Sequence, residues 1–193
     1  IAHALALQNR FSGHTKVPYS VAEHSVRVAR KFSNEGPEKR MKALLHDAAE
    51  TYMIDIPKPL KNFLEKSTSA VYEMEEAIIQ RIFKHFKLDG GLFPEIKTVD
   101  IRMLHTERRD LMEASPHDWK MIVEPYPEKI IPWRWEHAEL EFLQLFIEIM
   151  DARLALQREE MRKNIQDAHV KGRLALDSLR KVAYARAHQD NDE

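Results

Sequence analysis

The scarcity of chain-breaking residues is the feature that most constrains the fold of this sequence. Only 5 of its 193 residues are glycine, and long stretches contain neither glycine nor proline. Because tight turns and hairpins depend on these residues, a turn-rich β architecture is disfavoured, whereas helices can run without interruption. The chain is also long enough for one domain with a sizeable hydrophobic core. The sequence therefore predicts an all-α fold.

The apolar periodicity and the capping signals place the helices. The segment Ser20-Val21-Ala22-Glu23 fits a capping box, so a helix is expected from there to about Phe32. A second helix is expected to begin near Pro37 and to end before a rigid, proline-containing loop over 55–61. Further helices are expected over 67–88, 94–112 and 138–187, with an extended surface connection over 114–135.

These elements suggest a domain over residues 1–150 and a C-terminal helical extension over 151–193 that is not a separate domain. The extension is rich in charge, and Met161 and Ile165 are among its apolar residues. Its apolar side chains would face another helix, either in the same domain or in a second subunit.

Composition excludes several classes of protein. The absence of cysteine excludes disulfides and cysteine-ligated zinc, so any metal site must use His, Asp and Glu. With 30 basic and 31 acidic residues the net charge is -1, which implies no general attraction to a nucleic acid polymer. No apolar run approaches the roughly 20 residues that span a bilayer. We therefore expect a cytoplasmic protein with no membrane and no nucleic acid partner.

Several charged residues occur where an apolar helix face is expected. In the helix over 94–112, Asp100 and Glu107 each lie four residues from apolar neighbours on both sides, on the face that should be buried. A buried carboxylate is costly unless a cation or strong hydrogen-bond donors accompany it. Each of these two residues therefore needs a partner inside the fold.

The same reasoning applies to two earlier helices. His24 lies on the apolar stripe of its helix, and His46 and Asp47 lie in an otherwise apolar turn. Glu50 should share the side of the helix that carries His46 and Asp47. Any one of these residues alone has an ordinary explanation, a satisfied core histidine or a simple ion pair. Together, two imidazoles and two carboxylates suit a catalytic divalent ion with open positions for water and substrate.

These residues also resemble a known family. The order His24, His46-Asp47, Asp100 resembles the signature of HD-domain phosphohydrolases. The surrounding segments are similar to the YfbR/YfdR-type 5'-deoxynucleotidase branch, which also contains the phage dATP triphosphohydrolase DatZ. The segments that carry the resemblance are Asn9-Arg10-Phe11-Ser12-Gly13-His14, Tyr19-Ser20-Val21-Ala22-Glu23-His24-Ser25, Leu44-Leu45-His46-Asp47-Ala48-Ala49-Glu50, Asp55-Ile56-Pro57-Lys58-Pro59-Leu60-Lys61 and Thr106-Glu107-Arg108-Arg109-Asp110-Leu111.

The resemblance covers roughly residues 1–150 and implies a helical HD-domain bundle, with further chain before Ile1. It implies removal of phosphate at the 5' position of deoxynucleotides, with one divalent metal. The implied metal ligands are His24, His46, Asp47 and Asp100.

The resemblance also implies roles for residues around the metal. Glu50 would position or deprotonate the attacking water, and Asp55 would protonate the leaving oxygen or hold the sugar. Phosphate would be contacted by Arg10, Lys61 and Lys97, and the nucleoside pocket would be lined by Phe11 and Pro59.

Several alternatives remain open. Between Asp47 and Asp100 the only histidine is His85, in a basic patch, which favours one metal over two. His14 could add a ligand, contact phosphate or form a loop hydrogen bond. The metal could be Mn, Co, Fe, Ni, Zn or Mg, because nitrogen and oxygen ligands accept all of these.

The substrate is also open. A deoxynucleoside monophosphate is favoured, but a deoxynucleoside triphosphohydrolase that releases tripolyphosphate fits the same residues. A non-catalytic, nucleotide-binding regulatory protein is the third hypothesis. The resemblance further implies a homo-oligomer of unspecified size.

Overall fold

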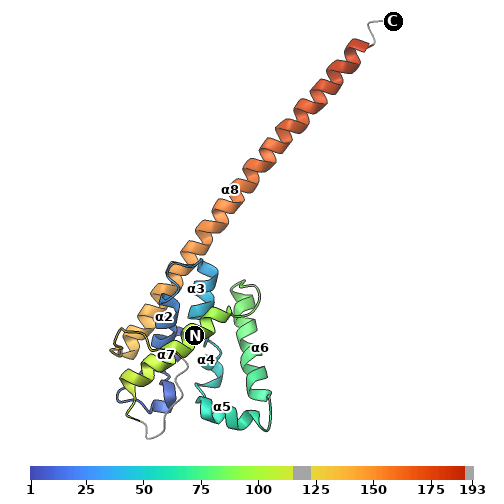
Figure 1. The fold of residues 1–193 in the computed structure, drawn as a ribbon. Helices are drawn as coiled ribbons and strands as arrows, with labels where there is room; N and C mark the ends of the chain where they lie inside the picture. The colour runs from blue at the N-terminus through green and yellow to red at the C-terminus, as the bar shows by residue number, and fades with distance from the viewer. Residues whose placement is uncertain (115–122, 190–193) are drawn as a thin grey trace. The chain divides into compact units, whose positions relative to one another are not determined.

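The computed structural model describes residues 1–114 and 123–189, with side chains described as far as Lys181. Within these ranges the chain is helical and has no strand, only an isolated bridge between Asn9 and Ser20, so the all-α prediction is confirmed (Figure 1). The elements in chain order are α1 (Ala2–Leu7), the 3-10 helix η1 (Arg10–Gly13), α2 (Val21–Arg30), α3 (Pro37–Leu44), α4 (Glu50–Met53), α5 (Lys58–Glu65), α6 (Ala70–His85), α7 (Pro94–Leu111) and α8 (Trp135–Gln189).

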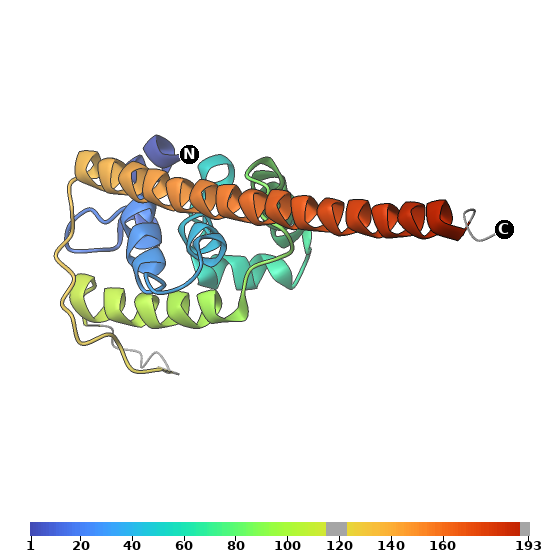
Figure 2. The ribbon, with the colours of Figure 1, turned by 90° about the horizontal axis from the view of Figure 1, so that it is seen from above.

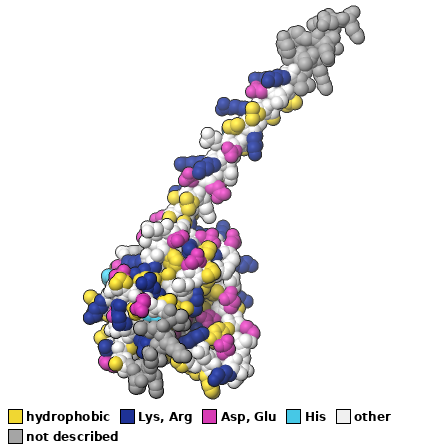
Figure 3. All heavy atoms as spheres, viewed as in Figure 1, with side chains coloured by type: hydrophobic (Ala, Val, Ile, Leu, Met, Phe, Trp, Pro, Cys, Tyr) yellow, Lys and Arg dark blue, Asp and Glu magenta, His cyan; other side chains and the backbone are white. Residues whose placement is uncertain are grey.

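The chain divides into two compact units, Ile1–Met150 and Asp151–Glu193, and α8 contributes to both. The first unit contains the hydrophobic core. In the second unit, apolar and charged side chains both lie on the helix surface, and Leu154, Met161 and Ile165 are all exposed (Figure 3). That residues 151–193 are a helical extension and not a separate domain stays a prediction.

Helix α2 is central to the first unit. It packs against α1, α3 and α7 (Figure 2). All of its residues from Val21 to Ala29 except Arg27 are buried. Three of those buried residues, Glu23, His24 and Ser25, are polar or charged. A helix surrounded on several sides can carry polar groups only where neighbouring elements supply partners. Its contacts therefore determine the geometry of the site described below.

The start of α2 fulfils half of the predicted capping box. The Ser20 hydroxyl accepts a hydrogen bond from the Glu23 backbone N–H at 3.1 Å, as an N-cap residue should. The Glu23 carboxylate does not return to the cap. It accepts hydrogen bonds from the Arg27 guanidinium and from the Trp133 backbone N–H instead. The predicted return bond from Glu23 to the cap is therefore wrong, because the next turn of α2 and a distant segment supply its partners instead.

The predicted continuous helix from Pro37 to Asp55 is interrupted. Helix α3 ends at Leu44 and α4 begins at Glu50, and the backbone between them turns more tightly than an α-helix. Its amide groups bond three residues back, from Ala48 to Leu45 and from Glu50 to Asp47, both at 3.0 Å. The expectation that Glu50 shares a regular helix face with His46 and Asp47 is therefore wrong in detail, because no regular helix spans the three residues.

The loop predicted over 55–61 is shorter than expected, because α5 begins at Lys58. Pro57 is its N-cap residue and Pro59 lies in its first turn, where a proline lacks no needed hydrogen bond. No side chain of α5 is buried. The residue before Asp55, Ile54, has a φ of 67°, a conformation that is costly for a β-branched residue.

The proline-rich connection before α8 is only partly described, because 115–122 lie outside the described residues. Residues 123–134 contain no helix, as predicted, although Ile130 is buried and the Arg27 guanidinium stacks 4.7 Å from the Trp133 ring centroid. Among the helices that the structure describes, none has the length and apolar character needed to cross a membrane.

A buried lysine joins α3 to the turn before α7. The Lys42 side chain is only 2% exposed. Its ammonium donates hydrogen bonds to the carbonyl oxygens of Asp89 and of Gly91, the latter at 3.0 Å, and lies 3.2 Å from a Glu38 carboxylate oxygen. The sequence did not single out Lys42, because a lysine at this position of a helix is ordinarily solvated.

Candidate metal centre

Three segments of the first unit bring four metal-capable side chains together. His24 comes from the buried face of α2, His46 and Asp47 come from the tight turn between α3 and α4, and Asp100 comes from the second turn of α7. The Nε2 atoms of His24 and His46 are 3.2 Å apart. Asp47 Oδ2 lies 3.5 Å and 3.2 Å from these two nitrogens, and Asp100 Oδ1 lies 3.3 Å and 4.0 Å from them.

The hydrogen bonds behind the two imidazoles determine which ring nitrogens face each other. His46 Nδ1 lies 2.8 Å from the Ala43 carbonyl oxygen, and His24 Nδ1 lies 2.5 Å from a Glu107 carboxylate oxygen. A carbonyl and a carboxylate only accept hydrogen bonds, so each Nδ1 carries a hydrogen. In neutral imidazoles both Nε2 atoms are then unprotonated, and two lone pairs face each other with two carboxylate oxygens beside them. Such an arrangement requires a positive charge between the groups, either a proton on one imidazole or a metal ion.

The spacing of His24, His46 and Asp47 fits a bound metal ion, and Asp100 adds an oxygen near both imidazoles. Ligands at about 2.1 Å from a common ion lie about 3.0 to 4.2 Å from one another, depending on the angle at the metal. All the distances above fall in or close to this range. His24, His46 and Asp47 form a group whose ligand atoms all lie within 4.8 Å of one another. Two nitrogens and one carboxylate oxygen, with the Asp100 oxygen beside them, suit a divalent ion of the first transition row.

The charges at the centre show the same need for a cation. Burial and the Arg10 charge act to lower the pKa of His24, but Glu107 and Asp100 outweigh them and raise it to about 10. Burial acts to raise the pKa values of Asp47 and Asp100, but the two imidazoles hold both carboxyl groups ionised. Without a metal, the site therefore retains a proton on His24 to compensate the surrounding negative charge.

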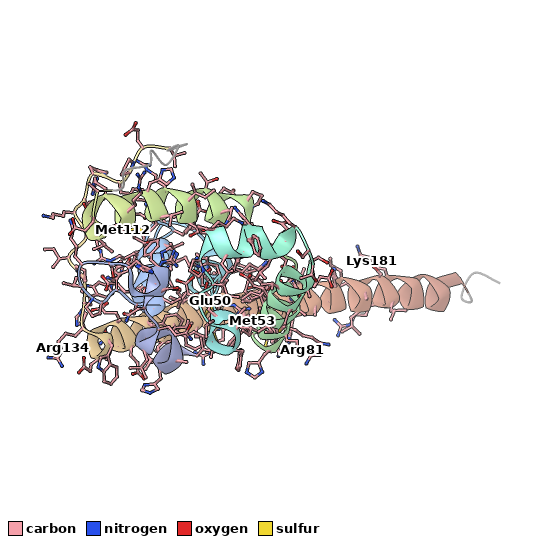
Figure 4. The ribbon with its side chains drawn as sticks, turned by 90° about the horizontal axis from the view of Figure 1, so that it is seen from below. Glu50, Met53, Arg81, Met112, Arg134 and Lys181 are labelled. Carbon is pink, nitrogen blue, oxygen red and sulfur yellow. The ribbon has the colours of Figure 1, made fainter. Side chains whose placement is uncertain are left out.

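Glu50 and Asp55 lie beside the centre. Burial, together with the charges of Asp47 and Asp55, raises the pKa of Glu50 to about 9. Its Oε2 atom is buried and has no hydrogen-bond partner within the described part of the chain. Figure 4 shows Glu50 amid the helices of the first unit. Asp55 Oδ2 accepts a hydrogen bond from the Phe11 backbone N–H at 3.1 Å. The Glu50 carboxyl group is therefore available for a proton or a bound water.

The three basic residues expected to contact phosphate have different surroundings. Lys97 Nζ donates a 2.9 Å hydrogen bond to Asp100, and the Lys97 side chain is largely exposed. Lys61 Nζ lies 2.7 Å from a carboxylate oxygen of Glu75 on α6. Arg10 is buried, and its guanidinium lies 3.2 Å from Asp47. All three are thus paired with a carboxylate, and they differ in exposure: Lys97 is largely open to solvent, whereas Lys61 and Arg10 are mostly covered.

Three further residues expected at the site, Phe11, Pro59 and His14, have no described contact with the metal-capable side chains. Phe11 is half-buried, and the Arg10 guanidinium lies 5.4 Å from the centroid of its aromatic ring. The backbone of Phe11 has a φ of 57°. Pro59 and His14 are both exposed, and no described contact joins either to the four metal-capable side chains. The structure therefore gathers Phe11 near the centre through Asp55, but it does not bring Pro59 or His14 to the metal-capable group.

Glu107 has a position that sequence reasoning did not define. It is fully buried and lies behind His24, where it also accepts a 2.9 Å hydrogen bond from the Tyr19 hydroxyl. Arg10 Nε is 3.3 Å from its second oxygen, an ion pair without hydrogen-bond geometry. The apolar stripe of α7 indicated that Glu107 is buried. Nothing in the sequence pattern identified Tyr19 and His24 as its partners.

Comparison with known proteins places the chain in a family. No protein-family model matches the sequence. It is 35% identical to the uncharacterized protein YfdR of Escherichia coli over 156 residues, which span 78% of this chain and 83% of YfdR. It is also 35% identical to an uncharacterized protein of Rhodobacter capsulatus over 103 residues, which span 50% of this chain and 51% of that protein. The extent of the first match shows that this chain belongs to the YfdR family.

Proposed function

We propose that this protein is a metal-dependent phosphohydrolase of the HD type that removes the 5'-phosphate from deoxynucleoside monophosphates. The observation that carries the proposal is the convergence of His24, His46 and Asp47, whose ligand atoms all lie within 4.8 Å of one another, with Asp100 Oδ1 3.3 Å and 4.0 Å from the two imidazole nitrogens. Beside them lies the buried carboxyl group of Glu50 with an unpartnered oxygen. A purely structural cluster would have no use for an unpaired acid next to a cation site.

The four converging side chains would hold the divalent ion. When bound, the ion supplies a water of lowered pKa and neutralises charge on the phosphate. Because burial and the charges of Asp47 and Asp55 raise the pKa of Glu50 to about 9, its carboxyl group holds a proton in the metal-free site. The positive charge of a bound ion would favour the ionised form, and the otherwise unpartnered Oε2 atom would then accept a proton from the attacking water. Lys97, exposed and 2.9 Å from Asp100, compensates negative charge on the phosphate oxygens.

Asp55 and Phe11 act on the nucleoside side of the reaction. The hydrogen bond from the Phe11 amide to Asp55 Oδ2 fixes that carboxyl group and leaves its other oxygen to meet the substrate. From there Asp55 would act in one of two ways: in its protonated form it would transfer its own proton to the leaving 5'-oxygen and become a carboxylate, or as a carboxylate it would hold the sugar by accepting a hydroxyl hydrogen bond. The family resemblance supports both roles, and it supports a cytoplasmic homo-oligomer as the working form of the enzyme.

The test is a substrate panel with purified full-length protein, stripped of metal and then supplied with Mn²⁺, Co²⁺ or Mg²⁺ in turn. Deoxynucleoside and ribonucleoside monophosphates are assayed for released inorganic phosphate. We expect release from deoxynucleotides that disappears in Asp47→Asn and persists in the matched control Asp89→Asn, because the Asp89 side chain is exposed and no described contact joins it to the metal-capable side chains. No phosphate release with any of the metals would refute the proposal.

The same panel separates the two other hypotheses. Deoxynucleoside triphosphates are included, and the products are resolved by phosphate chain length. Tripolyphosphate as the main product would identify a triphosphohydrolase. The three basic residues Arg10, Lys61 and Lys97 suit either substrate, so only the product separates the two. Tight nucleotide binding without any hydrolysis, unchanged in Asp47→Asn, would identify a regulatory nucleotide-binding protein.

A further inference from the structure

The Glu107 carboxylate is the most deeply enclosed acidic group near the centre. It is fully buried and lies seven residues after Asp100 on the same helix. Helix α7 therefore carries two acids near His24: the metal-capable Asp100, and Glu107 on the Nδ1 side of the imidazole. A buried carboxylate that merely filled space would be costly, and a hydrophobic residue would serve better. Its retention calls for a function that depends on its charge.

The hydrogen bonds of Glu107 show what that function is. One oxygen, Oε1, accepts from both His24 Nδ1, at 2.5 Å, and the Tyr19 hydroxyl, at 2.9 Å. Because a carboxylate oxygen only accepts, the His24 hydrogen is held on Nδ1, and the Nε2 lone pair is directed at His46, Asp47 and Asp100. The Tyr19 hydroxyl fixes the carboxylate from a different direction, so neither the imidazole nor the acid is free to rotate.

Arg10 connects the same carboxylate to a second ligand. Its Nε atom lies 3.3 Å from Glu107 Oε2, and its terminal nitrogen lies 3.2 Å from Asp47 Oδ2. The guanidinium is rigid and planar, so it sets the spacing between the acid behind His24 and the carboxylate of Asp47. Glu107 thus acts on His24 directly and on Asp47 through Arg10.

We infer that Glu107 is a positioning residue for the metal centre. It fixes the His24 tautomer, makes Nε2 a better electron-pair donor, and holds Arg10 against Asp47. Tyr19 supports it by orienting its carboxylate. A hydrogen bond from a ligating imidazole to a carboxylate is a common means of raising metal affinity, and its loss lowers that affinity by roughly 10-fold to 100-fold. The inference rests on the proposed metal-dependent function, and it assigns the buried acid a part in it.

The alternative is that Glu107 only stabilises the fold. The two roles differ in what they change. A structural role lowers the stability of the metal-free protein but leaves the metal affinity of the folded protein unaltered. A positioning role lowers the metal affinity of the folded protein, which is measurable without any turnover. Co²⁺ is a suitable probe because its visible absorption reports the ligands and the geometry directly.

The experiment compares Glu107→Gln, Tyr19→Phe and Glu113→Gln with the unaltered full chain. Glu107→Gln keeps the size of the side chain and removes its charge, and Tyr19→Phe removes one hydrogen bond to the carboxylate. Glu113→Gln is the matched control, because that side chain is 85% exposed and lies 3.9 Å from Lys16 at the surface. Co²⁺ affinity is measured by chelator competition at a temperature where circular dichroism shows each variant folded.

We expect the Co²⁺ affinity to fall roughly 10-fold to 100-fold in Glu107→Gln, with a changed Co²⁺ spectrum. It should fall about 2-fold to 10-fold in Tyr19→Phe, the equivalent of one hydrogen bond, and should be unchanged in Glu113→Gln. In the phosphate-release assay, kcat should fall in Glu107→Gln at saturating metal while KM for the nucleotide changes little.

The possible failures are distinguishable. If the unaltered protein binds no Co²⁺, the proposed function fails. If it binds Co²⁺ and a folded Glu107→Gln binds it equally well with the same spectrum, the positioning role is overturned and the proposed function stands. If Glu107→Gln does not fold, Tyr19→Phe decides the matter, since an unaltered Co²⁺ affinity in that variant overturns the inference.

Discussion

Replacing Lys42 by methionine removes an ammonium group from the core while keeping a side chain of similar length. The ammonium donates hydrogen bonds to the carbonyls of Asp89 and Gly91, in the turn that precedes α7. It also lies 4.7 Å from the Phe93 ring centroid. Methionine fills the same space but leaves both carbonyl oxygens without this donor. The substitution therefore isolates the polar contribution of Lys42 from its packing.

The magnitude follows from the two carbonyl contacts. A hydrogen bond to a charged group contributes about 1.5 to 3 kcal/mol, so two contribute about 3 to 6 kcal/mol. The lower end applies, because Asp89 and Gly91 are exposed and water can partly replace the lost donor, and because the buried ammonium is itself costly to desolvate. The half-exposed pair with Glu38 adds little. We expect a loss of about 3 kcal/mol, equivalent to a fall in Tm of about 6 to 12 °C.

The assay is thermal unfolding followed by circular dichroism on metal-free protein. Lys16→Met is the control, because the Lys16 side chain is 46% exposed and its Glu113 partner is 3.9 Å away, so a change of about 1 °C or less is expected. If the Tm of Lys42→Met stays within about 2 °C of the unaltered protein, the two carbonyl bonds contribute no net stability and the reasoning is refuted.

Three further outcomes follow from the structure. A divalent metal at about 100 times its Kd should stabilise the protein by about 2.7 kcal/mol, measured as a rise in Tm on adding Mn²⁺ to chelator-treated protein; the same rise in His46→Ala would contradict the proposed ligand set. Ile54→Gly should raise Tm slightly, because glycine tolerates the φ of 67° and the isoleucine is 66% exposed; a marked fall in Tm would show that the isoleucine packs usefully. The Arg109 hydrogen bond and the Ile130 amide hold the pKa of Asp110 below its usual value, so the stability it contributes is present above pH about 4 and is lost as pH falls through the lowered pKa. In urea unfolding, Asp110→Asn should therefore be less stable than the unaltered protein at pH 7, with a difference that shrinks on acidification; a constant difference would refute this assignment.

The sequence was most informative where structure depends on neighbours along the chain. Helix α7 was expected over 94–112 and spans Pro94–Leu111, because its proline start and apolar spacing are local signals. The same spacing indicated that Glu107 is buried, which the structure bears out. The Ser20 cap was also correct, because its hydrogen bond joins residues three apart.

The sequence was least informative where a residue's partner is remote. The Glu23 carboxylate bonds to the Trp133 amide, 110 residues away, and this overrode the local capping signal. The family resemblance implied that Arg10 contacts phosphate, and nothing in the sequence indicated that Arg10 is buried against Asp47 and Glu107. Side-chain type and spacing do not encode such partners, because they exist only once distant helices pack together.

By itself, then, the sequence determined the helical fold and the set of metal-capable residues, since both follow from periodicity and side-chain chemistry. Only the tertiary structure decided how those residues meet. The tight turn over 45–49 aims His46 and Asp47 at His24, and the packing of α7 on α2 places Asp100 before His24 and Glu107 behind it. The physical reason is that burying a charged group is tolerable only beside compensating charge, and that compensation comes from segments far apart in the chain.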